Sequence, residues 1–574
     1  MIKSGLRIFV TLLVAFLQAT MVFAQAQSEE GFIAEDGVLR YYRLALPVTT
    51  TCFQQHFGED RRAVEDFWQS AESSLNNIYV PLGVCFEVVK SDDLVATAMN
   101  DVDYNPLSAG GLGTELLNAM IGEQRYDVGL WIANALDFDN NGASVAGGAF
   151  LQRTKGGGYS APNATVVAHE LGHMFGALHP HDYGSATEPG MGQSIMGYGE
   201  QAHFFSVASI RQIRSQITER SAAYYADKER TQLVGSNEGG NYVWGVKVEN
   251  NAAPTIIDDK FQTKYRIPQG ANFSMTIAAH DADDDHLTYT LQQYEDGAAF
   301  CAKQPSADAT MDFKPQYTRF EWDDYFFIND GTDMAGMEPA TYRFAAVVND
   351  LPKDGALDRN SMERTPFYSN YDVRKVDVTI VAGTPFGISL SPNKATYEAG
   401  ERVKVSWGVN TNYFTAESKL RICLSDDYGN TYPYELATNV SALDGECEVV
   451  MPNVSFDTKE CVFGKVVASV RPGIVRVEEI GGIAYAQSLI SPMNDAAEAG
   501  FTMTGAIVDE EPLLGDVDGD GQVNVVDVSS IVNLLLDAVE GEYLNKEAAD
   551  INRDGKVDVV DVSALVSTLL NSQR

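Results

Sequence analysis

Three histidines and a glutamate in one short stretch have the types and spacing of a metal-binding site. Together with one glycine, the residues concerned are His169, Glu170, His173, Gly176 and His179. Residues four apart on a helix lie on the same face, so His169 and His173 can direct ring nitrogens at one ion. Zinc binds imidazole nitrogens at about 2.0–2.1 Å, and a catalytic zinc site keeps one position open for water. The spacing therefore predicts a helix that presents two ligands of a zinc site.

The remaining residues of the stretch can supply a third ligand and a base. Gly176 can adopt a positive φ, which ends the helix and lets the chain return His179 toward the same ion. Glu170 lies about 100° around the helix from His169, where its carboxylate can accept a proton from a water on the ion. Paired histidines also occur as ordinary surface or core residues, but the added glycine and third histidine make that alternative much weaker. These residues predict hydrolysis by a zinc-activated water with Glu170 as the general base.

A methionine-containing segment follows the third histidine. Ser194 to Tyr198 lies 15 to 19 residues after His179. This segment and the H-E-x-x-H-x-x-G-x-x-H stretch resemble the metzincin zinc peptidases, specifically the reprolysin-like (adamalysin) type. The resemblance implies that Met196 forms an apolar floor beneath the three imidazoles. It also makes Tyr198 a candidate to approach the metal, as a tyrosine can in astacins.

The acidic C-terminal region, 511–574, contains two calcium-loop patterns 34 residues apart. A glycine, Gly521 or Gly555, stands at loop position 6, where the sharp turn requires it. Positions 1, 3, 5, 7, 9 and 12 are occupied by Asp516, Asp518, Asp520, Gln522, Asn524 and Asp527 in the first loop and by Asp550, Asn552, Asp554, Lys556, Asp558 and Asp561 in the second. Position 7 contributes a backbone carbonyl, and carboxylates this close together require cations. The repeat predicts two bound calcium ions.

The repeated loops, each followed by an apolar helix, resemble a type I dockerin. The resemblance implies a small α-helical, calcium-binding module that binds a cohesin on a surface or scaffold protein. One departure is the pair of valines at positions 10 and 11 of each loop, Val525-Val526 and Val559-Val560, where many cohesin-binding dockerins carry Ser or Thr. The partner could therefore differ, or the module could simply cap the chain.

The elements that would hold the histidine stretch alternate between strands and helices. Strands are predicted near 41–46, 83–89 and 126–132, and an amphipathic helix over 60–79. A further helix begins near 162 and carries the histidines, and another covers about 205–220. The pattern predicts an α/β metzincin catalytic domain over 39–225.

Beyond a Gly-rich linker the apolar residues alternate with period two. Short alternating runs separated by turn residues predict two Ig-like β-sandwiches, over 245–383 and 384–500. The acidic turn at 281–285 could bind calcium or be an ordinary solvated turn. The overall expectation is a multidomain chain: a catalytic domain, two sandwiches and a dockerin.

The N-terminal segment has the features of a secretory signal. Lys3 and Arg7 precede an apolar run, and small residues end near Ala24, so 1–24 is predicted to be a signal peptide. Residues 25–38 are an N-terminal extension or a short propeptide, and 32–37 is loosely similar to the aspartate-switch propeptide of astacins. No later stretch is long and apolar enough to span a membrane. We expect a secreted protein, extracellular or associated with a cell surface.

Charge and cysteine content limit the partners further. The net charge is −39, from 80 acidic and 41 basic residues, which disfavours nucleic acid and anionic membranes as partners. Six cysteines in an exported chain permit disulfides, and Cys52 and Cys85 are a plausible pair because they are the only two in the N-terminal third.

Three functions are compatible with these residues. The favoured one is a secreted zinc endopeptidase that acts on protein or peptide substrates and is docked or capped by its dockerin. A non-catalytic adhesion or assembly protein with an inactive metzincin head is the alternative, although an inactive head has no need for Glu170. A third possibility places the main function in dockerin-mediated assembly.

Overall fold

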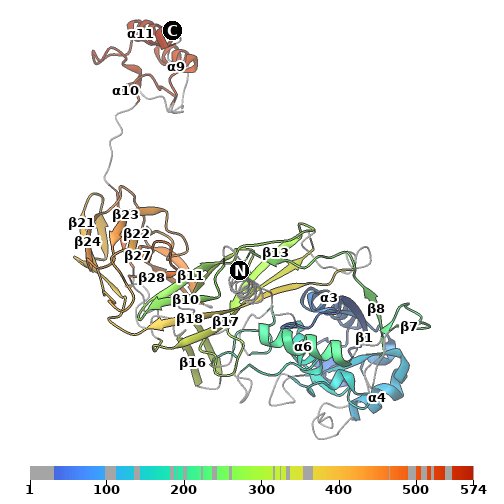
Figure 1. Cartoon of the computed structure of the whole chain (residues 1–574). Coiled ribbons are helices and arrows are strands. Elements are labelled where there is room, and N and C mark those ends of the chain that lie inside the picture. The colour runs from blue at the N-terminus through green and yellow to red at the C-terminus, as the bar shows by residue number, and fades with distance from the viewer. Residues whose placement is uncertain are drawn as a thin grey trace, which may run out of the picture. The chain divides into compact units, whose positions relative to one another are not determined.

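The computed structural model shows two compact units (Figure 1). The larger contains most of the chain up to Thr502, and the smaller consists mainly of Met503–Arg574. The signal-peptide range 1–24 and residues 25–30 lie outside the described residues. The structure describes residues 31–96, 112–134, 142–180, 187–189, 192–197, 203–220, 224–234, 242–257, 261–300, 302–313, 317–322, 325–330, 337–352, 366–463, 466–488, 500–505, 513–518, 522–536 and 546–572.

Strands and helices alternate in the first part of the chain, as the apolar pattern predicts. Its strands are β1 (Val38–Ala45), β2 (Val84–Val88), β3 (Val128–Ile132), β4 (Gly142–Ala143), β5 (Gly158–Ser160), β6 (Tyr224–Tyr225), β7 (Leu233–Val234) and β8 (Val243–Lys247). Its helices are α2 (Thr50–Gln55), α3 (Arg61–Tyr79), α4 (Leu112–Ile121), α5 (Ala164–Met174) and α6 (Val207–Arg220), with short 3₁₀ turns η1 (Val80–Leu82), η2 (Asp92–Leu94), η4 (Glu123–Arg125) and η6 (Gly148–Phe150).

The sheet of this α/β module is organised around β1. The strand order is β4-β5-β3-β1-β8-β6-β7, and β2 also pairs with β1. Strands β2 and β3 run parallel to β1, whereas β8 is antiparallel to it, with Val38 opposite Lys247. The expected end of the module at 225 is therefore too early, because the chain returns to the same sheet through β8. Sequence periodicity could not reveal this return, since it depends on pairing with a strand about 200 residues away.

Helix α3 connects the sheet to the helix that carries the histidines. Its apolar face is buried in the core, and Trp68 donates its indole N–H to the carbonyl of Leu46 at 3.0 Å. At its end, the buried Tyr79 hydroxyl donates to the carbonyl of Ala168 in α5 at 2.6 Å. These contacts anchor α5 one residue before His169.

The two cysteines of the N-terminal third are not joined in a disulfide, contrary to the expected pairing. Cys52 lies in the main core, whereas Cys85 packs with Leu39 and Tyr41 in a separate cluster. Successive strand residues face opposite sides of a sheet, so the orientation of β2 directs Cys85 away from the core that holds Cys52.

Residues 31–37 pack against the larger unit instead of reaching the histidines. Asp36 binds the guanidinium of Arg40 at 2.5 Å, and its backbone N–H donates to the Tyr368 hydroxyl at 3.1 Å. In this structure Asp36 is thus held by Arg40 rather than placed as an aspartate switch at the metal site.

A β-rich region follows the α/β module. Its strands are β9 (Thr255–Ile256), β10 (Lys264–Pro268), β11 (Asn272–Thr276), β12 (Ala279–His280), β13 (His286–Gln292), β14 (Thr310–Phe313), β15 (Tyr317–Trp322), β16 (Tyr325–Asp330), β17 (Thr341–Leu351), β18 (Tyr371–Val381), β19 (Ile388–Ser391), β20 (Thr396–Glu398), β21 (Arg402–Trp407), β22 (Lys419–Ser425), β23 (Tyr434–Ser441), β24 (Glu446–Val450), β25 (Lys459–Phe463), β26 (Val466–Val470), β27 (Ile474–Glu479), β28 (Ala484–Gln487) and β29 (Thr502–Thr504).

One sheet of this region crosses the expected boundary at 383/384. Its strand order is β14-β11-β28-β27-β22-β23, and β11 pairs with β28 through Phe273 opposite Ala484. A second sheet, β10-β18-β17-β13, is built from the first half of the region alone. The division into 245–383 and 384–500 therefore does not separate the sheets, because strands from both halves complete one of them. The Ig-like character of the two parts stays a prediction.

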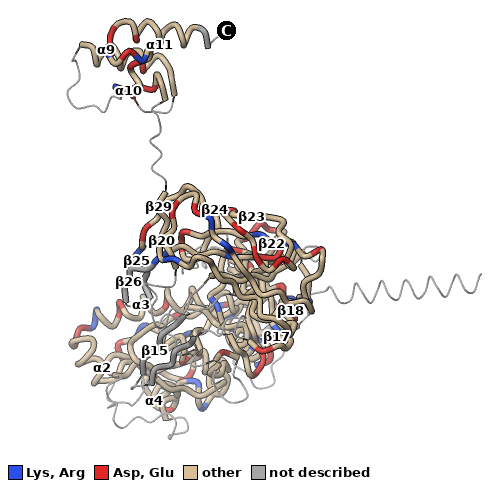
Figure 2. Tube along the Cα trace, turned by 90° about the vertical axis from the view of Figure 1, so that its left-hand side faces the viewer, with Lys and Arg blue, Asp and Glu red and all other residues tan. Residues whose placement is uncertain are grey.

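The smaller unit is helical. Helices α9 (Val525–Leu535), α10 (Lys546–Ala549) and α11 (Val559–Ser572) surround a small core of Val517, Ile531, Ala549 and Leu565. Asn524 caps α9 by accepting the N–H of Val526. Acidic positions are frequent along the loops of this unit (Figure 2). Among the described residues of the chain, no helix is long and apolar enough to cross a membrane.

Candidate metal centre

Helix α5 begins and ends as the local sequence predicts. Asn163 precedes it, and the Asn163 side chain accepts the N–H of Thr165, which satisfies one of the free donors of the first turn. Gly176 follows the helix with φ of 99°, a conformation that favours glycine. A β-carbon there would also lie 2.5 Å from the Gln216 side chain of α6. The chain thus turns sharply after α5 and brings His179 back toward it.

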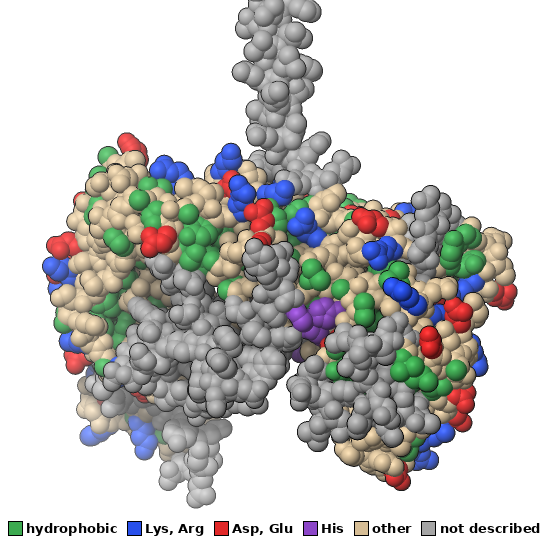
Figure 3. Space-filling model, turned by 90° about the horizontal axis from the view of Figure 1, so that it is seen from below, with side chains coloured by type: hydrophobic (Ala, Val, Ile, Leu, Met, Phe, Trp, Pro, Cys, Tyr) green, Lys and Arg blue, Asp and Glu red, His purple; other side chains and the backbone are tan. Residues whose placement is uncertain are grey.

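The three predicted histidine ligands converge. The Nε2 atom of His179 lies 3.2 Å from Nε2 of His169 and 3.0 Å from Nε2 of His173. All three histidine side chains are partly buried, and His169 is 9% exposed. Histidine side chains reach the surface in the space-filling view (purple in Figure 3).

The other ring nitrogens show which way the imidazoles are protonated. Nδ1 of His169 lies 2.7 Å from the carbonyl of Ile195, and Nδ1 of His173 lies 2.8 Å from the carbonyl of Ala177. A carbonyl can only accept a hydrogen bond, so each Nδ1 carries the proton and each Nε2 presents a lone pair. Lone pairs that face one another favour a bound cation.

The donor set fits zinc. Three nitrogens at zinc's bond length in tetrahedral directions would be separated by about 3.3 Å, close to the observed separations of 3.0 and 3.2 Å. Imidazole is a preferred ligand of zinc, and three nitrogens leave a fourth position open. His169, His173 and His179 are thus the residues that would hold the metal.

Glu170 is buried beside these histidines at 4% exposure. Strand β4 lies close to its carboxylate, because a β-carbon added to Gly142 would lie 2.5 Å from Oε1. Ser144 donates its hydroxyl to the Glu170 carbonyl at 2.8 Å, which ties β4 to α5. Burial raises the pKa of the Glu170 carboxyl to about 8, and a cation at the histidines would lower it.

Met196 is fully buried next to α5, as expected for a floor beneath the metal site. A β-carbon at Gly172 would lie 2.4 Å from the Met196 sulfur and 3.2 Å from the Phe205 ring. The turn around Met196 therefore packs directly on the helix that carries two of the ligands. Tyr198, the candidate to approach the metal, lies outside the described residues.

Several contacts of this centre were not foreseen from the sequence. They are the carbonyls of Ala177 and Ile195, the Ser144 hydroxyl and the close approaches of Gly142 and Gly172. Backbone carbonyls have no sequence signature. Gly142 and Gly172 gave no signal in the sequence. Each is required because another segment packs too closely to leave room for a side chain, and that packing is visible only in the folded chain.

The first predicted calcium loop of the smaller unit brings its described carboxylates together. Oxygen atoms of Asp516, Asp518 and Asp527 lie within 4.8 Å of one another. Asp527, which is fully buried, accepts the N–H of Val517 at 2.8 Å and the N–H of Asn524 at 2.7 Å. The backbone of Gln522 is described but Asp520 and Gly521 are not.

The second loop has the same organisation. Asp561 is fully buried and accepts the N–H groups of Asn552 and Asp558 at 3.1 and 2.9 Å, as Asp527 does in the first loop. Asp550 accepts the N–H groups of Asp554 and Gly555 at 3.0 and 2.8 Å. Gly555 has φ of 82°, which meets the requirement for a sharp turn, and the exposed Lys556 follows it at position 7.

Comparison with known proteins agrees with both sites. Residues 76–223 match the family described as metallo-peptidase family M12B, reprolysin-like, and residues 514–570 match the dockerin type I domain. The chain carries a reprolysin-like metallopeptidase domain and a type I dockerin domain. The histidine centre lies in the first match and both acidic loops in the second.

One curated relative resembles the peptidase domain. Over 158 residues the chain is 28% identical to the disintegrin and metalloproteinase domain-containing protein adm-2 of Caenorhabditis elegans. The match covers 26% of this chain and only 16% of that protein.

Two solved structures are weakly similar. One, described as a chaperone-substrate complex, matches at 13% identity over 31% of this chain and 33% of that chain, with a TM-score of 0.22. The other, human protocadherin-24 EC1-2, matches at 12% identity over 44% of this chain and 99% of that chain, with a TM-score of 0.15. Similarities at these TM-scores carry no structural argument.

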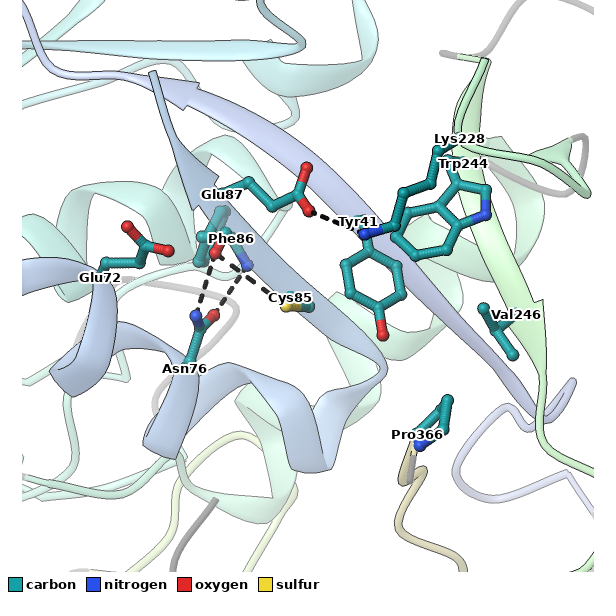
Figure 4. A pocket seen from close by; sticks show the side chains of 10 residues that line it. All are labelled: Tyr41, Glu72, Asn76, Cys85, Phe86, Glu87, Lys228, Trp244, Val246 and Pro366. Atoms are coloured by element: carbon teal, nitrogen blue, oxygen red, sulfur yellow. Dashed lines mark hydrogen bonds and ion pairs between the residues drawn. The ribbon is translucent and has the colours of Figure 1, made fainter. Parts of the chain in front are cut away.

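A cavity of about 260 Å³ lies between the α/β module and Pro366 of the β-rich region (Figure 4). Tyr41 and Trp244 stack along it with ring centroids 3.9 Å apart, and the Lys228 ammonium lies over the Trp244 ring and 4.0 Å from Glu87. None of the three histidines lines this cavity, so the metal centre is a separate site.

The acidic turn of the β-rich region also gathers carboxylates. Ligand atoms of Asp281, Asp283 and Asp285 lie within 4.8 Å of one another. Asp281 accepts the N–H groups of Asp283 and Asp285, and Asp283 accepts the N–H of Ala252. The two bonds within 281–285 are those of an ordinary turn, whereas the bond from Ala252 ties the turn to a segment 31 residues earlier, so both interpretations of this segment are compatible with the structure.

Proposed function

We propose that the protein is a secreted zinc endopeptidase in which Glu170 is the general base. The observation that carries the proposal is the convergence of three Nε2 atoms, two with their lone pairs turned inward by backbone carbonyls. The family match of the domain and the buried Glu170 carboxylate beside the histidines support it.

His169, His173 and His179 would hold the metal. A bound zinc ion supplies a lowered pKa for water and polarises the scissile carbonyl. Glu170 accepts the proton that water loses on attack and then passes it to the leaving amine. Its burial serves this role, because a carboxylate that water solvates poorly has a raised affinity for the proton.

The substrate is expected to lie along β4. Among the described strands β4 ends the sheet order, so its outer edge is proposed to pair with an extended peptide. Gly142 in β4 lies against Glu170, which would place a paired peptide close to the base. An extended segment of protein substrate fits this edge better than a small molecule does.

The dockerin is proposed to bind two calcium ions and to attach the peptidase to a cohesin-bearing surface or scaffold protein. The acidic loops support calcium binding, because three carboxylates of the first loop lie close together and Asp561 of the second loop accepts backbone N–H groups much as Asp527 does in the first. Attachment to a partner outside the cell accords with the predicted signal peptide at 1–24.

Cleavage of a denatured protein such as casein tests the proposal. We expect o-phenanthroline to abolish cleavage and added zinc to restore it. Glu170→Ala should retain one zinc per chain but lower kcat by about 10²–10⁴-fold, since the proton acceptor is lost. A Glu170→Ala variant with full activity would refute the role of the base. Zinc binding without any cleavage by the parent protein would instead favour the non-catalytic adhesion protein.

A further inference from the structure

Glu188 is a buried acid that the proposed chemistry does not use. It is 1% exposed, and among the described residues no Lys or Arg forms an ion pair with it. Burial raises the pKa of its carboxyl, while hydrogen bonds from Ser194 and from the N–H of Ala302 lower it. A buried carboxylate without a cation needs hydrogen-bond donors, and this one has several.

The donors come from two distant parts of the chain. Ser194 donates its hydroxyl to Oε2 at 2.7 Å and its N–H to the same oxygen at 3.4 Å. Gln193 donates its N–H to Oε1 at 3.4 Å. The fourth donor is the N–H of Ala302 in the β-rich region, 2.7 Å from Oε1 and 114 residues further along the chain.

The carboxylate and the backbone of Glu188 each contact a segment next to one of the proposed zinc ligands. Ser194 immediately precedes Ile195, whose carbonyl holds Nδ1 of His169 at 2.7 Å. The backbone N–H of Glu188 donates to the carbonyl of Pro180, the residue after His179, at 3.3 Å. One residue therefore connects the turn that orients the first ligand with the turn that supplies the third.

The space around this connection is closed. Gly192, with φ of 73°, has no room for a side chain, because a β-carbon would lie 2.7 Å from Pro180 and 2.8 Å from Glu188 Oε2. Ser194 has no exposed surface. Removal of the carboxylate would take away the acceptor that these donors share.

We propose that Glu188 is a positioning residue for the zinc site: its carboxylate clamps the Ser194–Met196 turn to the His179 turn and to Ala302 of the β-rich region. The inference rests on the proposed zinc function of the three histidines. It makes the β-rich region a structural part of the metal centre rather than a spacer. Groups that orient metal-binding histidines typically change metal affinity by about 10–100-fold when removed.

The test is zinc affinity of the full chain, measured by competition with a chromogenic chelator, for the parent, Glu188→Ala, Glu188→Gln and Ser194→Ala. We expect Glu188→Ala to weaken zinc binding about 10–100-fold. Glu188→Gln should lose less, because its amide oxygen can face Ala302 and Gln193 while its NH₂ group donates to the Ser194 hydroxyl. Ser194→Ala removes a single donor, and we expect a loss of several-fold.

Asp127→Asn is the matched control. Asp127 is a buried acid of the same domain, 6% exposed, whose partners Arg43 and Arg230 do not touch the histidines. This variant should be less stable than the parent, yet its zinc affinity should lie within about twofold of the parent's. Clearly weaker zinc binding by Asp127→Asn would show that loss of stability by itself lowers zinc affinity.

Each outcome bears on one claim. A parent chain that does not bind zinc overturns the proposed function itself. If the parent binds zinc and folded Glu188→Ala binds it equally well, the positioning role is wrong while the zinc function stands. If Glu188→Ala does not fold, Ser194→Ala decides: weaker zinc binding supports the role, and unchanged binding overturns it.

Discussion

Each helical histidine of the metal centre is held at its Nδ1 atom. The carbonyls of Ile195 and Ala177 fix the Nδ1 side, so Nε2 of His169 and of His173 can face a cation without a change of tautomer. Oε2 of Glu170 is buried without a hydrogen bond in the described part of the chain, while a hydrogen bond from Ser144 partly offsets the rise in pKa that burial causes. We propose that histidines fixed in this way hold the metal and that the buried Glu170 carboxyl moves the proton.

At this scale we predict that Gly142→Ala damages catalysis more than it damages folding. The new methyl group would lie 2.5 Å from Glu170 Oε1 and would displace the base. Displacement of a reacting group by about 1 Å can cost about 10²-fold in rate, so we expect kcat to fall by about 10–100-fold with zinc affinity unchanged. Steady-state kinetics and zinc titration measure the two effects.

Gly387→Ala is the control, because nothing lies within 4 Å of a β-carbon at that position, and it should behave as the parent does. Equal kcat values for Gly142→Ala and Gly387→Ala would contradict the prediction.

At the scale of elements, the metal centre is two helices and two turns packed without spare room. Helix α5 is fixed by Tyr79 of α3 on one side and by the Met196 turn on another. The geometry of the ligands therefore depends on contacts between elements rather than on α5 alone.

Gly172→Ala should separate α5 from the Met196 turn. A β-carbon would lie 2.4 Å from the sulfur of Met196, which is fully buried and cannot move into solvent. Overpacking of this kind costs about 1–3 kcal/mol. We expect a lower free energy of unfolding in urea, together with weaker zinc binding, because His169 and His173 shift with the helix. Loss of stability with unchanged zinc affinity would show that the turn does not position the ligands.

The ion pairs of Asp127 predict a pH dependence of stability. Burial opposes its ionisation, but hydrogen bonds from Arg230 and Arg43 outweigh burial and hold the pKa of its carboxyl below the ordinary value. A carboxyl with a lowered folded-state pKa stabilises the fold above its unfolded-state pKa of about 3.9, and this contribution is lost as the pH falls through the folded value. Asp127→Asn should therefore cost about 3 kcal/mol at pH 7.

Urea unfolding of the parent and of Asp127→Asn at several pH values measures this dependence. The difference between the two proteins should be constant from pH 7 down to about pH 5 and shrink below about pH 4. A difference that instead grows on acidification would contradict the assigned direction of the pKa shift.

At the scale of the whole molecule, the β-rich region is continuous with the peptidase rather than appended to it. Strand β8 returns to the peptidase sheet, and Ala302 reaches Glu188. Within the β-rich region, β11 and β14 share a sheet with β28, β27, β22 and β23. The dockerin is the part with a core of its own.

Truncation should reveal this continuity. A chain that ends after residue 505 keeps β28 and β29, so we expect it to unfold cooperatively and to bind zinc as the parent does. A chain that ends after residue 383 exposes the edge of β11 that β28 covers, and open strand edges promote association. Size-exclusion chromatography and calorimetry should show aggregation or a lower unfolding temperature for the shorter chain alone. Equal stability of both chains would refute the shared sheet.

Calcium should stabilise the dockerin without affecting the peptidase domain. At a free calcium concentration of about 100 times Kd, binding to the folded state contributes about 2.7 kcal/mol per site. We expect calorimetry to show one transition that moves to higher temperature with calcium and a second that does not. The double variant Asp527→Ala and Asp561→Ala should abolish the shift, and its persistence would rule out these loops as the calcium sites.

The sequence by itself determined the candidate chemistry: the proposed metal ligands, the proposed base and the proposed calcium loops all lie in short segments whose geometry follows from helix period and turn requirements. His169 and His173 converge because residues four apart share a helix face, and Gly176 and Gly555 have the positive φ that their turns require. Strands β1, β2 and β3 and helices α3, α5 and α6 were likewise predicted from the residue pattern, whereas α2, α4 and the short strands β4 to β7 were not.

Only the tertiary structure decided which distant segments meet. Cys52 and Cys85 lie on different sides of the sheet, β8 returns to β1, and one sheet crosses the boundary expected at 383/384. Glu188, Gly142 and the Ile195 carbonyl join the metal centre through contacts of the same long-range kind. Such contacts depend on strand register and on packing between elements. Neither produces a periodic pattern in the sequence from which the contacts could be predicted.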